Sequence, residues 1–197
     1  MKIEDINITE TKIETARLIL RPFEEKDTDD FYEYTQVPGV GEAAGWNHHE
    51  TKKQSAAVVK AIIAGKRTFA VAEKESGKVI GSIGFEPCSE IYNDLGLGEN
   101  VYNIGYVLGQ KYWGKGYANE IVRGILSYAF YVLHLDAVTC AHFKGNDSAK
   151  KVLLSRGLKQ VAEGKYTTQQ GKEYDALYYA VTAKEYGVEY KPVINEV

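Results

Sequence analysis

The segment QKYWGKGYANE, residues 110–120, decides the fold, because it separates an apolar stretch from a long amphipathic pattern. Its small residues Gly114, Gly116 and Ala118 predict the end of a strand, a turn and the start of a helix. The first amides of a helix have no acceptor within the helix, and the helix dipole adds partial positive charge there. Such a turn binds phosphate when side chains leave the approach open, and Lys115 adds positive charge.

Two well-known phosphate-binding motifs do not fit this turn. A P-loop needs a lysine followed by serine or threonine after its last glycine, whereas Tyr117 follows Gly116. A dinucleotide-binding fingerprint needs a small residue where Asn119 stands, although Asp136 has about the spacing of the acid that binds the ribose. Asp136 begins its strand, while that acid belongs at the end of a strand. A glycine turn that only packs a helix on a sheet is the structural alternative.

The composition indicates one folded domain. The chain has 197 residues, 44% of them hydrophobic and 26% charged, which is enough for one core and short for two. A formal charge of −3 gives no basic footprint for nucleic acid. Neither a signal sequence nor a run long enough to span a membrane is present, and Cys88 and Cys140 lack metal-ligand spacing. We therefore expect a cytoplasmic protein that binds no nucleic acid, membrane or metal, and the sequence neither requires nor excludes a homodimer.

Hydrophobic periodicity predicts strands interrupted by helices. Short apolar or alternating runs predict strands at 15–23, 68–74, 78–85, 101–108, 136–143, 158–164 and 174–181. Helical spacing predicts helices near Phe31, over 51–66 with Gly65 as the stop, over 116–133 with Val132 on the buried stripe, and over 147–157. Antiparallel strands joined by hairpins come first and a strand–helix–strand unit follows. This order predicts a mixed α/β or α+β fold.

Three segments together resemble one protein family. Gly116-x-Ala118 is similar to the acyl-CoA diphosphate loop of the GNAT N-acetyltransferases, Gln/Arg-x-x-Gly-x-Gly/Ala, with Trp113 at the Gln/Arg position. Within that family, YWGKGYANE resembles the branch that acetylates ribosomal-protein N-termini, the RimJ/RimL-like proteins. TARLILRPF, residues 15–23, and NDSAKKVLLSRGL, residues 146–158, resemble two further signatures of this branch.

The resemblance implies the fold and its extent. We expect a single GNAT acetyltransferase domain over residues 1–197, with its core at about 15–182 and short extensions at both ends. The GNAT fold has a mixed, mostly antiparallel central sheet flanked by helices. Two of its parallel strands splay apart and hold acyl-CoA between them.

The resemblance also implies where acetyl-CoA, the acyl donor, binds. Backbone groups of Tyr106, Val107 and Leu108 are expected to contact the pantetheine arm, with the Leu108 N–H as the oxyanion donor. Asn146 is expected to reach pantetheine from the other side, and as an asparagine before a helix it is also a candidate N-cap. The diphosphate is expected to bind the turn formed by Trp113, Gly114, Lys115, Gly116, Tyr117, Ala118 and Asn119.

The implied reaction is direct acetyl transfer to a primary amine, either a protein or peptide N-terminus or a small molecule. Leu153 replaces the tyrosine that protonates the leaving thiolate in many members, so Ser148 becomes the candidate acid and a further donor contact. Asn103 replaces a glutamate that many members have before Ile-Gly-Tyr. Glu86, His142 or a chain of waters are the candidates for the base.

The acceptor site is expected around a glycine-rich loop, residues 35–50, which is long enough to suggest a function. Trp46 and His48, with the neighbouring His49, are predicted to form the rim of the acceptor pocket, and Asn103 is assigned to the same pocket. The alternative function is a non-catalytic module that binds or senses acyl-CoA. This alternative follows because Asn103 and Leu153 stand at two positions where many members of the family carry catalytic groups.

Overall fold

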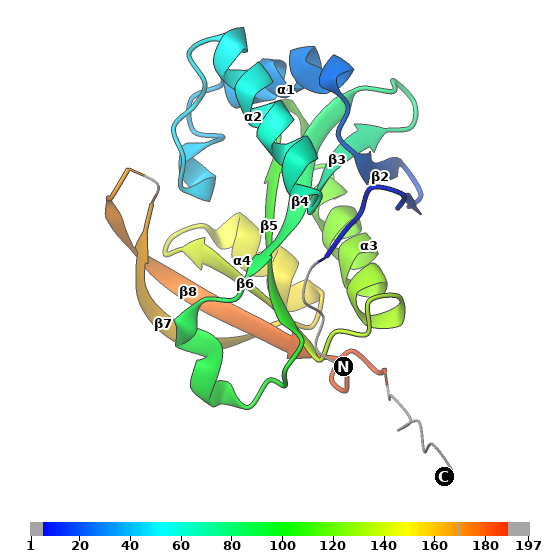
Figure 1. Ribbon diagram of the computed structural model, residues 1–197. Helices are drawn as coiled ribbons and strands as arrows, with labels where there is room; N and C mark the ends of the chain where they lie inside the picture. The colour runs from blue at the N-terminus through cyan, green and yellow to red at the C-terminus, as the bar shows by residue number, and fades with distance from the viewer. Residues whose placement is uncertain (1–5, 169, 189–197) are drawn as a thin grey trace.

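The central element is an eight-stranded sheet with the strand order β1-β2-β3-β4-β5-β6-β8-β7 (Figure 1). The structure, a computed structural model, describes residues 6–168 and 170–188. The strands are β1 (Ile13–Glu14), β2 (Leu18–Pro22), β3 (Thr68–Glu73), β4 (Val79–Pro87), β5 (Val101–Leu108), β6 (Ala137–Phe143), β7 (Lys159–Thr167) and β8 (Glu173–Thr182). Neighbouring strands are antiparallel except β5 and β6, which are parallel. The expected mixed, mostly antiparallel sheet is confirmed.

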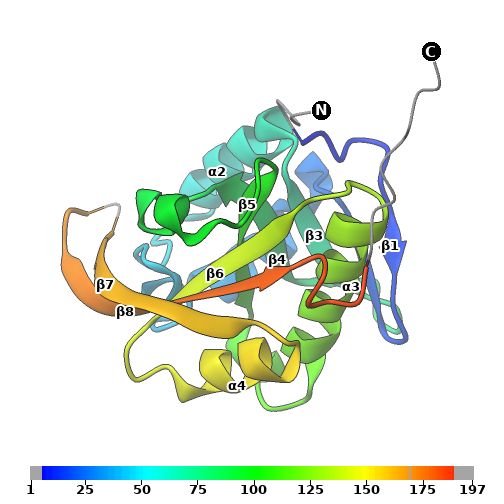
Figure 2. The same cartoon turned by 90° about the horizontal axis from the view of Figure 1, so that it is seen from below.

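Helices cover both faces of the sheet (Figure 2). They are α1 (Thr28–Thr35), α2 (Lys52–Gly65), α3 (Tyr117–Tyr131) and α4 (Asp147–Ser155), with short 3-10 turns at Glu25–Asp27, Glu42–Ala44, Glu90–Leu95 and Gln110–Tyr112. We call the two sides the α1/α2 face and the α3/α4 face. The larger apolar core lies under α3 and α4, and a second core lies under α1 and α2.

Helix α3 packs through the stripe expected from its spacing, apart from its last member. Ile121, Ile125 and Ala129 are fully buried, whereas Val132 is 60% exposed. The helix ends at Tyr131, and Val132 is its C-cap residue with a φ of −111°. The prediction for Val132 was wrong because the chain leaves the helix before the stripe reaches that position.

The end of α2 also differs from the expectation. Gly65 is the last helical residue, and Lys66 is the one that adopts the left-handed conformation, with φ of 55°. The Lys66 carbonyl accepts a hydrogen bond from the Ile8 N–H at 3.0 Å. This contact helps to hold a conformation that normally favours glycine. By contrast, the turn between β3 and β4 has a glycine in this conformation, Gly77 with a φ of +71°.

Candidate active site

The parallel strands β5 and β6 separate in the middle of the sheet. They pair at Val101 with Ala137, Tyr102 with Val138, and Asn103 with Thr139. Beyond this point β5 stays paired with β4 as far as Leu108, while β6 stays paired with β8 as far as Phe143. A V-shaped opening between two strand edges results, and such edges carry backbone groups without a strand partner.

The hydrogen-bond alternation of the antiparallel pair β4–β5 shows which backbone groups face this opening. Gly109 N–H donates to Ile80 O at 2.8 Å, so the next pair, Gly81 and Leu108, is of the type that does not exchange hydrogen bonds. The N–H groups of Leu108 and Tyr106 therefore point away from β4 toward the opening. Val107 falls between them and directs its backbone toward β4, so its expected backbone contact with the donor is not supported.

Trp113 connects the end of β5 to the glycine turn. Its indole Nε1–H donates to Leu108 O at 2.6 Å, while its side chain is 47% exposed. This hydrogen bond occupies the carbonyl of Leu108. The N–H of Leu108 points to the same side of β5 and takes no part in this bond. Trp113 thus fixes the turn relative to β5.

The expected glycine turn before a helix is present, and both of its glycines have positive φ angles. Gly114 has a φ of +73° and Gly116 a φ of +81°, and Gly116 is the N-cap of α3. A Cβ atom on Gly114 would meet nothing within 4 Å. Left-handed glycines alternating with other residues turn successive N–H groups toward one concave side, which binds anions. The free amides at the start of α3 extend this concave site.

The side chains of this segment make contacts within the protein. Tyr117 is 8% exposed, and its hydroxyl donates to Glu73 Oε1 at 2.5 Å. Asn119 Oδ1 accepts from Ser155 Oγ at 2.6 Å, which ties α3 to α4. The Lys115 Nζ lies 5.5 Å from the centre of the Tyr112 ring. The contribution of Tyr117, Ala118 and Asn119 to anion binding would therefore come from their backbone.

The start of α4 lies after the free edge of β6. Asn146 is its N-cap, because its Oδ1 accepts from Ala149 N–H at 3.1 Å, so this structural role is confirmed. Ser148 is exposed in the first turn of α4. Leu153 is fully buried in the core and provides no acid.

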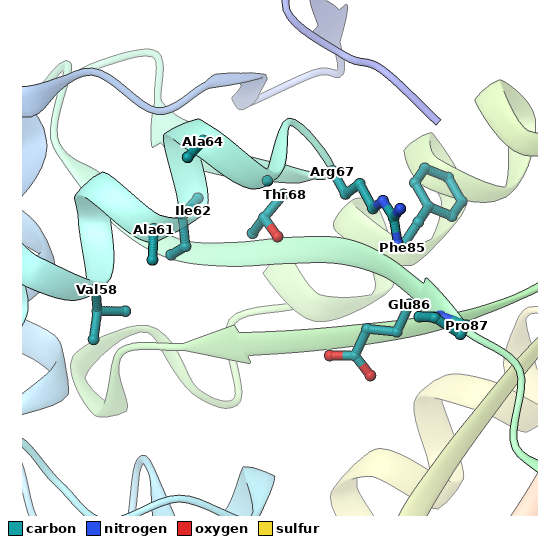
Figure 3. A pocket seen from close by; sticks show the side chains of 10 residues that line it. Val58, Ala61, Ile62, Ala64, Arg67, Thr68, Phe85, Glu86 and Pro87 are labelled. Atoms are coloured by element: carbon teal, nitrogen blue, oxygen red, sulfur yellow. The ribbon is translucent and has the colours of Figure 1, made fainter. Parts of the chain in front are cut away.

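Glu86 lies on the α1/α2 face beside the point where β5 and β6 separate. Figure 3 shows its side chain and that of Phe85 on opposite sides of β4, and Glu86 belongs to the lining of a groove between β4 and α2. A Cβ atom on Gly105 of β5 would lie 3.4 Å from Glu86 Oε1. Glycine at this position therefore leaves room for the exposed carboxylate to extend over β5.

A short chain of hydrogen bonds orients this carboxylate. Asn103 Nδ2 donates to Glu86 Oε2 at 3.4 Å. Fully buried Thr139 donates from Oγ1 to Asn103 Oδ1 at 3.3 Å, which fixes the orientation of the amide, and Cys88 Sγ lies 3.4 Å from Thr139 Oγ1. No local pattern in the sequence marks Thr139 as part of the site. Only the pairing of β5 with β6 shows its role.

His142 lies on the other face of the sheet from Glu86. Val138, Cys140 and His142 are two residues apart along β6 and therefore share one face of the sheet. Val138 and Cys140 pack in the α3/α4 core on that face. The ring is 7% exposed, Nδ1–H donates to Phe143 O at 2.9 Å, and Nε2 accepts from the Tyr179 hydroxyl at 3.1 Å. With both ring nitrogens engaged, His142 is poorly placed as a base.

The cysteines near the opening are not poised as nucleophiles. Burial and, to a smaller extent, the charge of Glu86 raise the pKa of the Cys140 thiol to about 12. Burial also raises the pKa of Cys88, against a hydrogen bond with Thr139 that lowers it. Because the thiolate is the reactive form, neither cysteine is activated for a covalent acyl intermediate at neutral pH.

The loop over residues 35–50 is more internally packed than expected. The Trp46 ring packs on Gly41, and its centre lies 5.3 Å from the centre of the His49 ring. His49 is buried, and its Nδ1 lies 2.7 Å from Ser55 Oγ. His49 is therefore an internal residue of the loop and does not form a rim. His48 Nδ1 lies 2.7 Å from Glu42 Oε1, at the half-exposed outer side.

The same loop approaches the opening. The 3-10 turn Glu42–Ala44 contacts β5 and β6, and a Cβ atom on Gly45 would lie 3.2 Å from the Tyr166 ring and 3.5 Å from the Phe143 ring. The loop and the β7–β8 hairpin thus wall the α1/α2 side of the opening. Within the described part of the chain, no group of His, Cys, Asp and Glu could hold a metal ion. None of the helices placed there is long and apolar enough to cross a membrane.

Known proteins resemble this chain over most of its length. Residues 17–159 match the family described as Acetyltransferase (GNAT) domain. The uncharacterized N-acetyltransferase YnaD of Bacillus subtilis is 29% identical over 175 residues, which cover 88% of this chain and 98% of that protein. The crystal structure of a GNAT-family acetyltransferase from Bacillus anthracis is similar, with a TM-score of 0.77, 25% identity, and coverage of 88% of this chain and 99% of that chain. RimJ of Mycobacterium smegmatis, in complex with CoA-disulfide, has the same fold with a TM-score of 0.69, 19% identity and 88% coverage of both chains.

Proposed function

The chain belongs to the GNAT acetyltransferase family, and on that premise we propose that it transfers the acetyl group of acetyl-CoA directly to a primary amine. The observation that carries the proposal is the separation of β5 and β6 beyond Asn103 and Thr139, next to the left-handed glycine turn at the start of α3. The opening suits an extended arm with amide groups, and the turn suits a diphosphate. Both features fit acyl-CoA, which supplies the thioester carbonyl when bound.

The donor would be held mainly by backbone groups. Tyr106 and Leu108 direct their N–H groups into the opening, and the turn from Gly114 to Asn119 provides amides for the diphosphate. The side chain of Asn146 stands at the far edge, where its Nδ2 is free of the capping bond made by Oδ1. A preorganised backbone donor such as the Leu108 N–H can stabilise developing negative charge on the carbonyl oxygen by about 3 kcal/mol.

Proton transfer from the acceptor is assigned to Glu86. Its carboxylate is exposed on the α1/α2 face, lies over Gly105 beside the opening, and is oriented by Asn103. A negative charge at this point also attracts an ammonium group before it loses its proton. A protein or peptide N-terminus and a small-molecule amine both satisfy this requirement.

The leaving thiolate needs little help. An ordinary thiol has a pKa near ~8.5, so its anion is a tolerable leaving group near neutral pH. This fits the replacement of the usual tyrosine by buried Leu153, and it leaves Ser148 as a hydroxyl within the first turn of α4 that can donate to the departing sulfur.

The proposal is tested by CoA binding and by acetylation of a panel of amines. We would titrate CoA calorimetrically and detect acetylated products by mass, using ribosomal N-terminal peptides, polyamines, aminoglycosides and amino acids. Formation of a product supports transfer and identifies the class of acceptor. Binding without turnover of any amine would instead favour an acyl-CoA-binding module, and absence of CoA binding would refute the proposal.

A paired substitution tests the assigned donor site. Gly116→Val places a branched residue at a φ of +81°, which L side chains rarely adopt, so the backbone of the turn should change and CoA binding should be lost. Gly187→Val is the control, because Gly187 has a φ of +90° and open space but belongs to the segment after β8. Comparable losses of CoA affinity in both variants would show that the effect is only destabilisation.

A further inference from the structure

The segment TARLILRPF contributes strand β2, but its first residues have contacts that the proposed chemistry does not use. Thr15 Oγ1 donates to Glu120 Oε1 at 2.5 Å, and the backbone N–H of Arg17 donates to the same oxygen at 2.6 Å. Arg17 Nε donates to Glu120 Oε2 at 2.8 Å. Two segments separated by about a hundred residues, each similar to a signature of one family branch, therefore bind each other directly.

The guanidinium of Arg17 also holds the glycine turn itself. Its Nη1 donates to Lys115 O at 3.0 Å, and its Cζ lies 4.2 Å from the centre of the Tyr117 ring. A Cβ atom on Gly116 would lie 3.5 Å from Nη2. Arg17 thus contacts Lys115 and Tyr117 on either side of Gly116, and it anchors the turn to strand β2 and the residues before it.

The direction of one peptide group follows from this anchor. In a trans peptide the C=O and the next N–H point in opposite directions. With the Lys115 carbonyl held by Arg17, the N–H of Gly116 is turned to the opposite side. This N–H comes directly before the first amides of α3, which have no acceptor within the helix, so it can join them in binding an anion.

Arg17 also balances the charge of Glu120. Glu120 belongs to the first turn of α3, and its side chain is only 15% exposed. A carboxylate is favourable near a helix N-terminus but would repel a diphosphate bound at the same place. Pairing with Arg17 removes much of this repulsion, because opposite charges at 2.8 Å largely cancel at a distance.

We infer that Arg17 is a positioning residue for the diphosphate of the acyl donor, acting through the Lys115 carbonyl and the Glu120 carboxylate. This inference rests on the proposed function. It predicts that removal of Arg17 weakens the binding of only those acyl donors that carry the diphosphate. A purely structural contact would instead affect every donor to the same degree.

The experiment compares acetyl-CoA with S-acetylpantetheine, which has the same thioester and arm but no diphosphate. For Arg17→Met we expect the KM for acetyl-CoA and the Kd for CoA to rise about tenfold or more, the usual effect of losing a hydrogen bond to a charged group. The kcat with acetyl-CoA and the kcat/KM with S-acetylpantetheine should change by less than about twofold. Arg17→Lys should restore part of the affinity, because it retains the charge without the planar fork.

The control is Arg123→Met, which removes the same charge from an exposed position on α3. It should leave the Kd for CoA within about twofold of the wild type. Equal losses for both donors, or unchanged CoA affinity in Arg17→Met, would refute the inference while leaving the proposed function intact. If Arg17→Met does not fold, Arg17→Lys gives the same comparison between donors. Failure of the wild-type protein to bind CoA would refute the proposed function and the inference together.

Discussion

Replacement of Glu86 by glutamine isolates the proposed base. Glutamine has the same shape and can still accept the hydrogen bond from Asn103 Nδ2, so the position over Gly105 should be retained. Only the ability to take up a proton is lost. The fold should therefore be unchanged, and a thermal melt of Glu86→Gln should overlay that of the wild type.

The expected loss of rate follows from the exposure of this carboxylate. A positioned general base contributes about 10²–10⁴-fold, and we expect the lower end because water can reach Glu86 and replace part of its function. The predicted decrease in kcat/KM is about 100-fold at pH 7, or ~2.7 kcal/mol in the barrier. An acceptor α-amino group of pKa ~7.8 is neutral in about one molecule in seven at pH 7 and in about nine in ten at pH 9. If the variant can use only neutral amine, its deficit should shrink about sevenfold between these two values.

The assay is steady-state kinetics from pH 6 to 9 with the best acceptor of the panel. Glu90→Gln is the matched control, since Glu90 is an exposed glutamate shortly after β4. His142→Gln gives the contrast, because His142 has both ring nitrogens engaged on the opposite face, and it should retain the wild-type pH profile. Identical profiles for Glu86→Gln and the wild type would refute the assignment of Glu86. A rate deficit in His142→Gln that shrinks between pH 7 and pH 9 would instead assign the base to His142.

Three further changes test the fold around the site. Arg21→Met leaves Asp27, which is 4% exposed and bound at 2.7 and 2.8 Å, without its partner, so we expect a loss of about 3–5 kcal/mol and a Tm decrease of roughly 10 °C; an unchanged melt would contradict this. Gly81→Ala would place a methyl group against a main-chain oxygen of β5, and should lower stability by about 1–3 kcal/mol and also lower kcat, as unfolding and rate measurements would show. Burial opposes the charged form of Glu42, but hydrogen bonds from His48 and nearby amides lower its pKa from 4.5 to about 2. Because the folded pKa is below the ordinary one, the stabilisation is present above pH 4.5 and lost as pH falls toward 2, so Glu42→Gln should be less stable than wild type at pH 6 and equal to it near pH 2. A difference that persists at pH 2 would exclude this cause.

The sequence alone was sufficient for the features that depend on neighbouring residues. The strands and helices follow from the spacing of apolar side chains, and the order of elements predicts antiparallel strands followed by a strand–helix–strand unit. Gly114 and Gly116 predict a turn at the start of a helix, and Asn146 predicts a helix cap. The resemblance of three short segments added the family, which the comparisons confirm.

Only the tertiary structure decided which distant residues meet. The separation of β5 and β6 depends on where two strands stop pairing, and no pattern within either strand marks that point. Glu86 and His142 are equivalent candidates in the sequence, yet the packing of their strands places them on opposite faces. The contact of Arg17 with Glu120 and the alignment of Thr139 with Asn103 likewise arise from strand and helix packing across long stretches of chain. Local periodicity specifies which residues share a face of an element, whereas register and packing decide what that face contacts.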